Sequence, residues 1–187
     1  MILYPTETIY ALGANALDDA AIESLNFLKG RGEEKFLSWL VRDIEDIAQY
    51  GELSSKAAEI ASQFLPGPLT LVLPAKENIP PDLRGPDNTV SFRISPDPIA
   101  QQVIAEFMEQ HNAPLTCTSA NVSGLATEQT PEAILKQFGD KASLIDKVVD
   151  DGPRSGQPST VIKVVDDDIE IIREGAISAH AILGLSH

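Results

Sequence analysis

The chain has 187 residues and a net charge of −14, from 14 Lys and Arg against 28 Asp and Glu. This balance argues against a protein whose main partner is a nucleic-acid backbone, because phosphate binding needs a basic surface. The single cysteine, Cys117, excludes an intramolecular disulfide, and no stretch approaches the roughly 18 apolar residues that a membrane span needs. The first residues lack the features of a signal peptide, so we expect a cytoplasmic protein, not bound to a membrane, with one domain over residues 1–187.

The first half of the chain alternates short apolar runs with helical patterns. Asp18 can cap a helix whose apolar residues keep helical spacing as far as Lys29, and Gly30 can end it. Further helices are predicted at residues 43–50 and 54–65. The predicted strands lie at residues 2–4, 36–41 and 70–73, and a loop rich in Pro, Gly and Asp is predicted at residues 75–88.

The second half begins in the same way and ends in β-rich runs. The predicted elements are a strand at 90–94, a helix at 97–110, a strand at 115–118 and a helix at 130–138 with Pro131 at its first position. Three runs at 144–149, 160–165 and 169–172 look like strands of one sheet. Strands and helices without strict βαβ alternation favour a mixed α/β (α+β) fold with a twisted, partly antiparallel sheet flanked by helices.

Three cations, Lys29, Arg31 and Lys35, fall within seven residues of this acidic chain. Flanking glycines allow the backbone to approach a ligand closely, and arginine can grip a phosphate or carboxylate with two N–H groups. The cluster therefore indicates an anion site. The alternative is a solvated helix end, where cations are favourable against the helix dipole.

Two turns rich in hydroxyl groups follow predicted strands, one at residues 5–13 and one at residues 119–124. Each can present N–H and hydroxyl groups to an anion, or can satisfy its own backbone. Arg93 lies in a predicted strand between apolar neighbours, where it needs a partner or points to solvent; strand alternation favours solvent. Arg173 ends a strand and faces either a ligand or a surface carboxylate. Cys117 is better read as a small buried hydrophobe than as a nucleophile.

Several motifs of known chemistry are missing from the sequence. It contains no Walker A loop, no GxGxxG, no CxxC pair, no legible Ser-His-Asp set and no histidine cluster. An enzyme built from these residues would bind anions and would not attack with a side chain.

Three motifs in order and at matching spacing resemble the YrdC-like threonylcarbamoyl-adenylate synthases from residue 2 to about residue 179. They are PTETIYALGANALD (residues 5–18), LPGPLTLVL (residues 65–73), and Lys29-x-Arg31 paired with Ser119-x-Asn121. The resemblance implies a YrdC-like fold with an open concave ligand face. It implies condensation of L-threonine, bicarbonate and ATP to threonylcarbamoyl-AMP with release of pyrophosphate. A partner threonylcarbamoyl transferase complex would use the product to modify adenosine 37 of tRNA, so contact with tRNA would be indirect.

The resemblance also implies roles for individual residues. It implies that Lys29, Arg31 and Lys35 are catalytic. It implies ATP contacts by Arg31, Lys35, Thr89, Ser119, Asn121, Thr127 and Arg173. It implies threonine contacts by Thr8, Arg93 and Ser159, with a magnesium ion accompanying ATP and no metal ligand assigned among the side chains.

Departures from the family pattern keep a second interpretation open. The chain begins almost at its first predicted strand, so we expect an N-terminus shorter than is usual in the family. Gly32 and Phe36 stand where the family has prolines, and a more flexible cation loop loses more entropy when it is ordered. The alternative is a nucleotide- or RNA-binding paralogue with little or no synthase activity.

Overall fold

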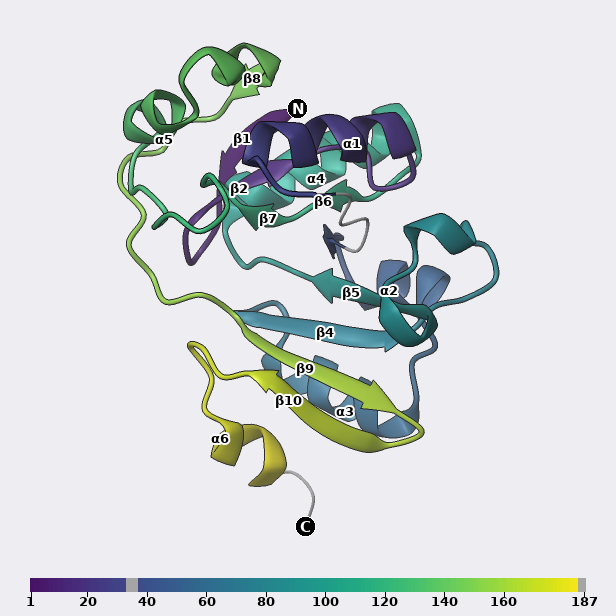
Figure 1. Ribbon diagram of the computed structural model, residues 1–187. Helices are drawn as coiled ribbons and strands as arrows, with labels where there is room; N and C mark the ends of the chain where they lie inside the picture. Colours follow the sequence, from purple (N-terminus) through teal and green to yellow (C-terminus); the bar gives the residue numbers. More distant parts are fainter. Residues whose placement is uncertain (33–36, 185–187) are drawn as a thin grey trace.

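The computed structural model describes residues 1–32 and 37–184 (Figure 1). The strands are β1 Ile2–Pro5, β2 Tyr10–Gly13, β3 Ser38–Leu40, β4 Leu69–Pro74, β5 Thr89–Arg93, β6 Leu115–Thr116, β7 Thr118–Ser119, β8 Lys147–Val148, β9 Thr160–Val165 and β10 Asp168–Arg173. The α-helices are α1 Asp19–Lys29, α2 Ile44–Tyr50, α3 Ser55–Phe64, α4 Pro98–His111, α5 Pro131–Phe138 and α6 Ala179–Leu183. Short 3-10 turns lie at Pro81–Leu83, Pro86–Asn88 and Gly139–Leu144.

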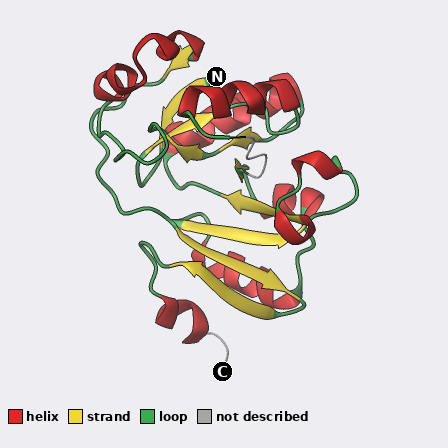
Figure 2. Ribbon diagram, viewed as in Figure 1, coloured by secondary structure: helices red, strands yellow, loops and turns green. Residues whose placement is uncertain are grey.

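The strands form two mixed sheets, drawn in yellow in Figure 2. The small sheet has the order β7-β2-β1-β8, and the large sheet has the order β10-β9-β4-β5-β3-β6. Both contain parallel and antiparallel pairs: β1 runs antiparallel to β2 and parallel to β8, and β4 runs antiparallel to β5 and parallel to β9. The predicted mixed α/β fold class is confirmed, with the strands divided between two sheets.

Side-chain alternation along β1 explains why the small sheet is covered on both faces. Leu3 joins a buried cluster with Ile22 and Leu25 of α1, whereas its neighbour Tyr4 joins a second cluster with Ile104 of α4. Successive strand residues point to opposite faces, so β1 contributes to both clusters. Burial of these apolar side chains holds α1 and α4 against the sheet.

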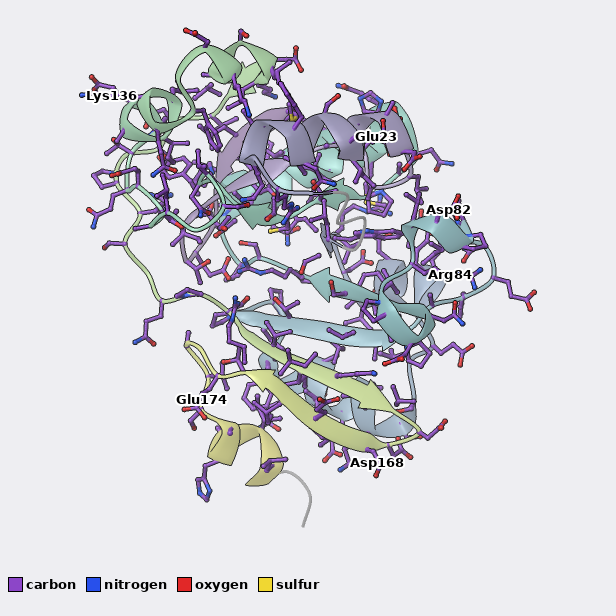
Figure 3. All side chains as sticks on the ribbon, viewed as in Figure 1. Glu23, Asp82, Arg84, Lys136, Asp168 and Glu174 are labelled. Atoms are coloured by element: carbon purple, nitrogen blue, oxygen red, sulfur yellow. The ribbon has the colours of Figure 1, made fainter. Side chains whose placement is uncertain are left out.

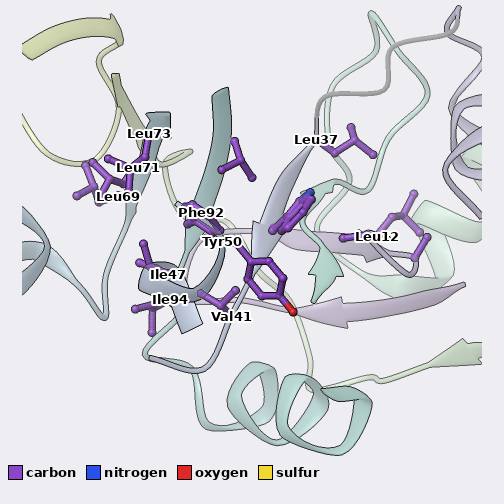
Figure 4. Close-up of a cluster of buried hydrophobic side chains, with 14 of the residues drawn as sticks. Leu12, Leu37, Val41, Ile47, Tyr50, Leu69, Leu71, Leu73, Phe92 and Ile94 are labelled. Carbon is purple, nitrogen blue, oxygen red and sulfur yellow. The ribbon is translucent and has the colours of Figure 1, made fainter. Parts of the chain in front are cut away.

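The large sheet is covered by helices on one face. The leucines at positions 69, 71 and 73 of β4 are completely buried with Ile47 of α2 and Ile60 of α3, and Figure 4 shows part of this cluster. The alternate residues Thr70 and Val72 point to the other face, where they line cavities. The sequence of β4 therefore buries one face of the sheet and leaves the other available to a ligand.

The helix boundaries follow the predicted capping residues. The Asp18 carboxylate accepts a hydrogen bond from the N–H of Ala21 at 3.2 Å, and Gly30 ends α1 in the left-handed conformation with φ of 66°. Pro131 is the first residue of α5, as predicted. Among the described residues, no helix is long and apolar enough to cross a membrane.

Three details of strand placement differ from the prediction. Residues 10–13, predicted as part of a turn, form β2. The predicted strand 115–118 is split at Cys117 into β6 in the large sheet and β7 in the small sheet. The last three β-rich runs do not share one sheet, because β8 pairs with β1 whereas β9 and β10 join the large sheet. Each difference depends on pairing with strands far away in sequence, which local patterns do not specify.

Candidate functional site

A polar cavity of about 320 Å³ lies where the two sheets approach each other. Its lining includes most of the predicted site residues, namely Thr8, Arg31, Arg93, Ser119, Asn121, Thr127, Ser159 and Arg173. The lining as described contains three arginines and no Asp or Glu. Charged side chains such as Glu23, Asp82, Lys136 and Asp168 instead point outward over the surface (Figure 3). The cavity thus gathers positive charge inside a strongly acidic protein, and an anion is its natural ligand.

Arg93 ends β5 inside the cavity and does not point to solvent, contrary to the expectation from strand alternation. The residue is only 6% exposed, and its Nη2 donates to Glu7 Oε1 and, at 3.4 Å, to Thr8 Oγ1. Its Nη1 faces Cys117 Sγ at 3.8 Å, and its Nε has no hydrogen-bond partner. Arg93 therefore brings to the cavity lining a buried guanidinium with N–H groups that Glu7 and Thr8 do not occupy, which is suited to a carboxylate or phosphate oxygen.

The threonines of the turn between β1 and β2 are held by one another. Thr6 Oγ1 donates to Ile9 O at 2.7 Å and lies 3.0 Å from Thr8 Oγ1. Gly156 N donates to Thr8 O at 2.8 Å, and a Cβ added at Gly156 would lie 2.6 Å from that oxygen. The loop before β9 therefore packs against this turn only with glycine at position 156, which brings Ser159 to the same cavity as Thr8.

Ser159 and Arg173 form the wall of the cavity on the side of the large sheet. Ser159 Oγ lies 2.8 Å from Thr70 Oγ1, and Arg173 Nη2 donates to Ser159 O at 2.7 Å. Burial, together with repulsion by Arg93, lowers the pKa of Arg173. An arriving anion would relieve this repulsion between the two guanidinium groups.

The turn Ser119–Asn121 forms the opposite wall and is closed by its own hydrogen bonds. Ser119 Oγ donates to Asn121 Oδ1 at 2.5 Å, and Asn121 Nδ2 donates to Leu125 O at 2.8 Å. Arg31 approaches from the end of α1, where Asn26 Oδ1 accepts a hydrogen bond from its Nε at 2.8 Å. The predicted pairing of Arg31 with the Ser119–Asn121 turn in one cavity is therefore present.

Lys29 lies behind this turn and is not among the lining residues of the cavity. Its side chain is buried, and its Nζ donates to the backbone oxygen of Ser119. Burial, with a smaller contribution from the charge of Arg31, lowers the pKa of Lys29 from 10.5 to about 7. Lys29 thus joins the end of α1 to the Ser119–Asn121 turn. Lys35 lies outside the described residues.

The lowered pKa of Lys29 predicts a pH-dependent stability. Between pH 7 and 10.5 the unfolded chain keeps a proton on Lys29 that the folded chain releases, so the unfolded state binds more protons. The contribution of Lys29 to the free energy of unfolding therefore rises with pH, by at most about 1.4 kcal/mol per pH unit, and is lost as the pH falls towards 7. Urea denaturation of the wild type and of Lys29→Met at pH 7 and pH 9 measures it. The free energy of unfolding of the wild type minus that of Lys29→Met should be larger at pH 9 than at pH 7. An equal difference at the two pH values would contradict the lowered pKa.

A second, more apolar cavity of about 520 Å³ adjoins the first, and Leu37, Ser38, Thr70 and Val161 line both. Thr89 lies in this second cavity and not with the other predicted ATP contacts, and its Oγ1 donates to Pro86 O at 2.7 Å. The other side chains that line it include Val72, Leu83, Val90 and Ile172. The two cavities together offer a cationic half and an apolar half, as a nucleotide requires.

Sequence reasoning did not identify Glu7, Ser38 or Thr70 as part of the site. Glu7 lies inside the PTET motif, yet its pairing with Arg93 spans 86 positions in sequence. Ser38 and Thr70 sit on strands, where the only available signal was a polar residue alternating with apolar ones. Cys117 is buried as predicted, and it also lines the cavity beside Arg93.

The fold and the cavity define a mixed α/β protein with a cationic, hydroxyl-rich site for anionic ligands, and comparisons with known proteins agree with this class. A family model described as "Telomere recombination", named for Sua5, YciO and YrdC, matches residues 1–175. A Methanocaldococcus jannaschii protein named "Putative threonylcarbamoyl-AMP synthase" is 38% identical, over 95% of this chain and 80% of that protein. The threonylcarbamoyl-AMP synthase of Pyrococcus abyssi is 33% identical, over 95% of this chain and 51% of that protein.

The crystal structure of P. abyssi Sua5 complexed with L-threonine superposes with a TM-score of 0.85 at 32% identity, over 98% of this chain and 53% of that chain. The chain thus spans about half the length of this relative. The chain belongs to the Sua5/YciO/YrdC family.

Proposed function

We propose that this protein synthesises L-threonylcarbamoyl-AMP from L-threonine, bicarbonate and ATP, with release of pyrophosphate. The observation that carries the proposal is the single cavity that joins Thr8, Arg93 and Ser159 with Arg31 and the Ser119–Asn121 turn. The two groups are the threonine and ATP contacts that the family resemblance implies. Similarity to threonylcarbamoyl-AMP synthases, and to a Sua5 structure holding L-threonine, supports this reaction.

Threonine would bind at the end of the cavity formed by Arg93. Its carboxylate would accept hydrogen bonds from the Arg93 N–H groups that Glu7 and Thr8 leave available. The hydroxyls of Thr8 and Ser159 lie in the same lining and would fix the orientation of the substrate. The amine would then be held towards the centre of the cavity.

ATP would extend across both cavities. Its phosphates would lie among Arg31, Arg173 and the Ser119–Asn121 turn, with Thr127 on the same wall. Its base and ribose would reach the apolar cavity beside Thr89. Lys35 is expected to add a further charge to the phosphates. Lys29 would act by holding the Ser119–Asn121 turn.

The chemistry requires no nucleophile from the protein. The threonine amine combines with bicarbonate, losing water, to give N-carboxy-threonine. One oxygen of the new carboxylate attacks the α-phosphorus of ATP, and the bond to the β-phosphate oxygen breaks, so that pyrophosphate leaves. The protein holds the reactants together and places fixed cations where negative charge gathers on the phosphate oxygens.

The remaining components are proposed from the same reaction. Magnesium would arrive on the triphosphate, whose oxygens are its usual ligands. Within residues 1–32 and 37–184 no group of three or more His, Cys, Asp or Glu side chains gathers that could hold a metal ion. The product would pass in the cytoplasm to a threonylcarbamoyl transferase complex that modifies adenosine 37 of tRNA.

Pyrophosphate release tests the proposed reaction. With ATP and magnesium present, release should require both L-threonine and bicarbonate, and omission of either should reduce it to the background rate. D-threonine serves as a control of equal charge. ATP binding without threonine-dependent release would contradict the proposal and would indicate a nucleotide-binding paralogue.

A further inference from the structure

Glu7 holds the guanidinium of Arg93 from outside the cavity. Its Oε1 accepts a hydrogen bond from Arg93 Nη2, and the two side chains are only 16% and 7% exposed. Glu7 is not among the residues that line the cavity, although its neighbour Thr8 is. Glu7 therefore contacts the proposed threonine-binding arginine without lining the cavity itself.

The second oxygen of Glu7 is fixed by a completely buried serine. Glu7 Oε2 accepts a hydrogen bond from Ser95 Oγ, which in turn accepts one from Asp97 N at 3.2 Å. Asp97 caps α4, and Gln101 of that helix donates to Ser95 O at 2.6 Å. A continuous set of contacts thus runs from the start of α4 through Ser95 and Glu7 to Arg93.

This arrangement leaves one part of Arg93 unused. Its Nη2 is occupied by Glu7 and Thr8, its Nη1 faces Cys117, and its Nε has no partner. A guanidinium is planar and rigid, so contacts at both Nη2 and Nη1 fix the direction of the remaining N–H groups. Without Glu7, Arg93 Nη2 would keep only the longer contact with Thr8, and more of the binding energy would be spent on ordering the guanidinium.

We infer that Glu7, anchored by Ser95, is a positioning residue that orients Arg93 so that its remaining N–H groups meet the carboxylate of the amino-acid substrate. The inference rests on the proposed function, because it takes threonine as the ligand of Arg93. It gives Glu7 no contact with the substrate and no part in proton transfer. Its effect should therefore fall on threonine affinity and leave ATP affinity unchanged.

Calorimetric binding of L-threonine and of ATP, each measured alone, tests this role. Glu7→Gln keeps the size of the side chain but removes its charge, and should weaken threonine binding about tenfold with ATP binding within twofold of wild type. Ser95→Ala leaves Glu7 charged but unanchored, and should weaken threonine binding about threefold. Glu23→Gln, which changes an exposed glutamate of α1, is the matched control and should change neither.

The outcomes separate this role from the proposed function. Threonine binding by Glu7→Gln within twofold of wild type would overturn the role, and so would tighter binding, which would mean that Glu7 competes with the substrate. Equal loss of both ligands would indicate general damage and would also overturn it. If Glu7→Gln does not fold, Ser95→Ala decides by the same comparison of the two ligands. Failure of the wild type to bind threonine would instead refute the proposed function, and this role with it.

Discussion

Replacing Arg93 by alanine is expected to lower kcat/KM for threonine at least a hundredfold. Loss of a charged hydrogen-bonding partner from a desolvated site costs about 3 kcal/mol, which corresponds to roughly that factor. Arg93→Lys should recover little of the loss, because an ammonium group lacks the planar set of N–H donors that reaches Glu7 and the ligand together. Steady-state kinetics with varied threonine, with pyrophosphate as the readout, measures both variants.

Stability must be measured alongside, because Arg93→Ala leaves the carboxylate of Glu7 without its cation. Thermal melting identifies a temperature at which the variant is folded, and the kinetics are compared there. Arg84→Ala is the matched control, since Arg84 donates to Ile79 O, outside the threonine site. A folded Arg93→Ala variant with kcat/KM for threonine within threefold of wild type would remove Arg93 from that site.

Lys29→Ala and Arg31→Ala should each reduce the rate of pyrophosphate release at least tenfold, which is about 1.4 kcal/mol of transition-state stabilisation. The causes differ. Arg31 lines the cavity, so its loss removes a cation from the proposed phosphate site. Lys29 is buried under the Ser119–Asn121 turn, so its loss releases the Ser119 carbonyl and leaves a hole at the end of α1.

The two variants should therefore separate in melting temperature. Lys29→Ala is expected to lower it by several degrees, whereas Arg31→Ala should change it less, because Arg31 is only partly buried. Lys136→Ala, at an exposed site on α5, controls for loss of a cation. Wild-type rates in both Lys29→Ala and Arg31→Ala would remove these two residues from the reaction.

Local signals in the sequence predicted most of the elements. The Asp18 cap, the Gly30 stop and Pro131 at the start of α5 each act through hydrogen bonds or backbone angles within a few residues, and all three are confirmed. The family resemblance implied a set of polar site residues, most of which line the polar cavity, whereas Lys29 and Thr89 do not and Lys35 lies outside the described residues. These motifs carried spatial information that composition and periodicity did not.

Other features depend on contacts between distant parts of the chain. Strand alternation predicted that Arg93 faces solvent, yet the turn after β1 supplies Glu7 as its partner. β6 and β7, on either side of Cys117, pair in different sheets, and so do β8 and β9. The position of Lys29 behind the cavity follows from the packing of α1 on the Ser119–Asn121 turn. A single sequence has no local signal for such pairings.

The central claim is that the cavity joins threonine, carbon from bicarbonate and AMP into one product. Its most direct test is mass spectrometry of the reaction mixture with ordinary and with ¹³C-labelled bicarbonate. We predict a threonylcarbamoyl-AMP species that requires all three substrates and whose mass rises by one unit, that is, one ¹³C atom, with the label. An adenylate of threonine that lacks the labelled carbon, or no adenylate at all, would contradict the account.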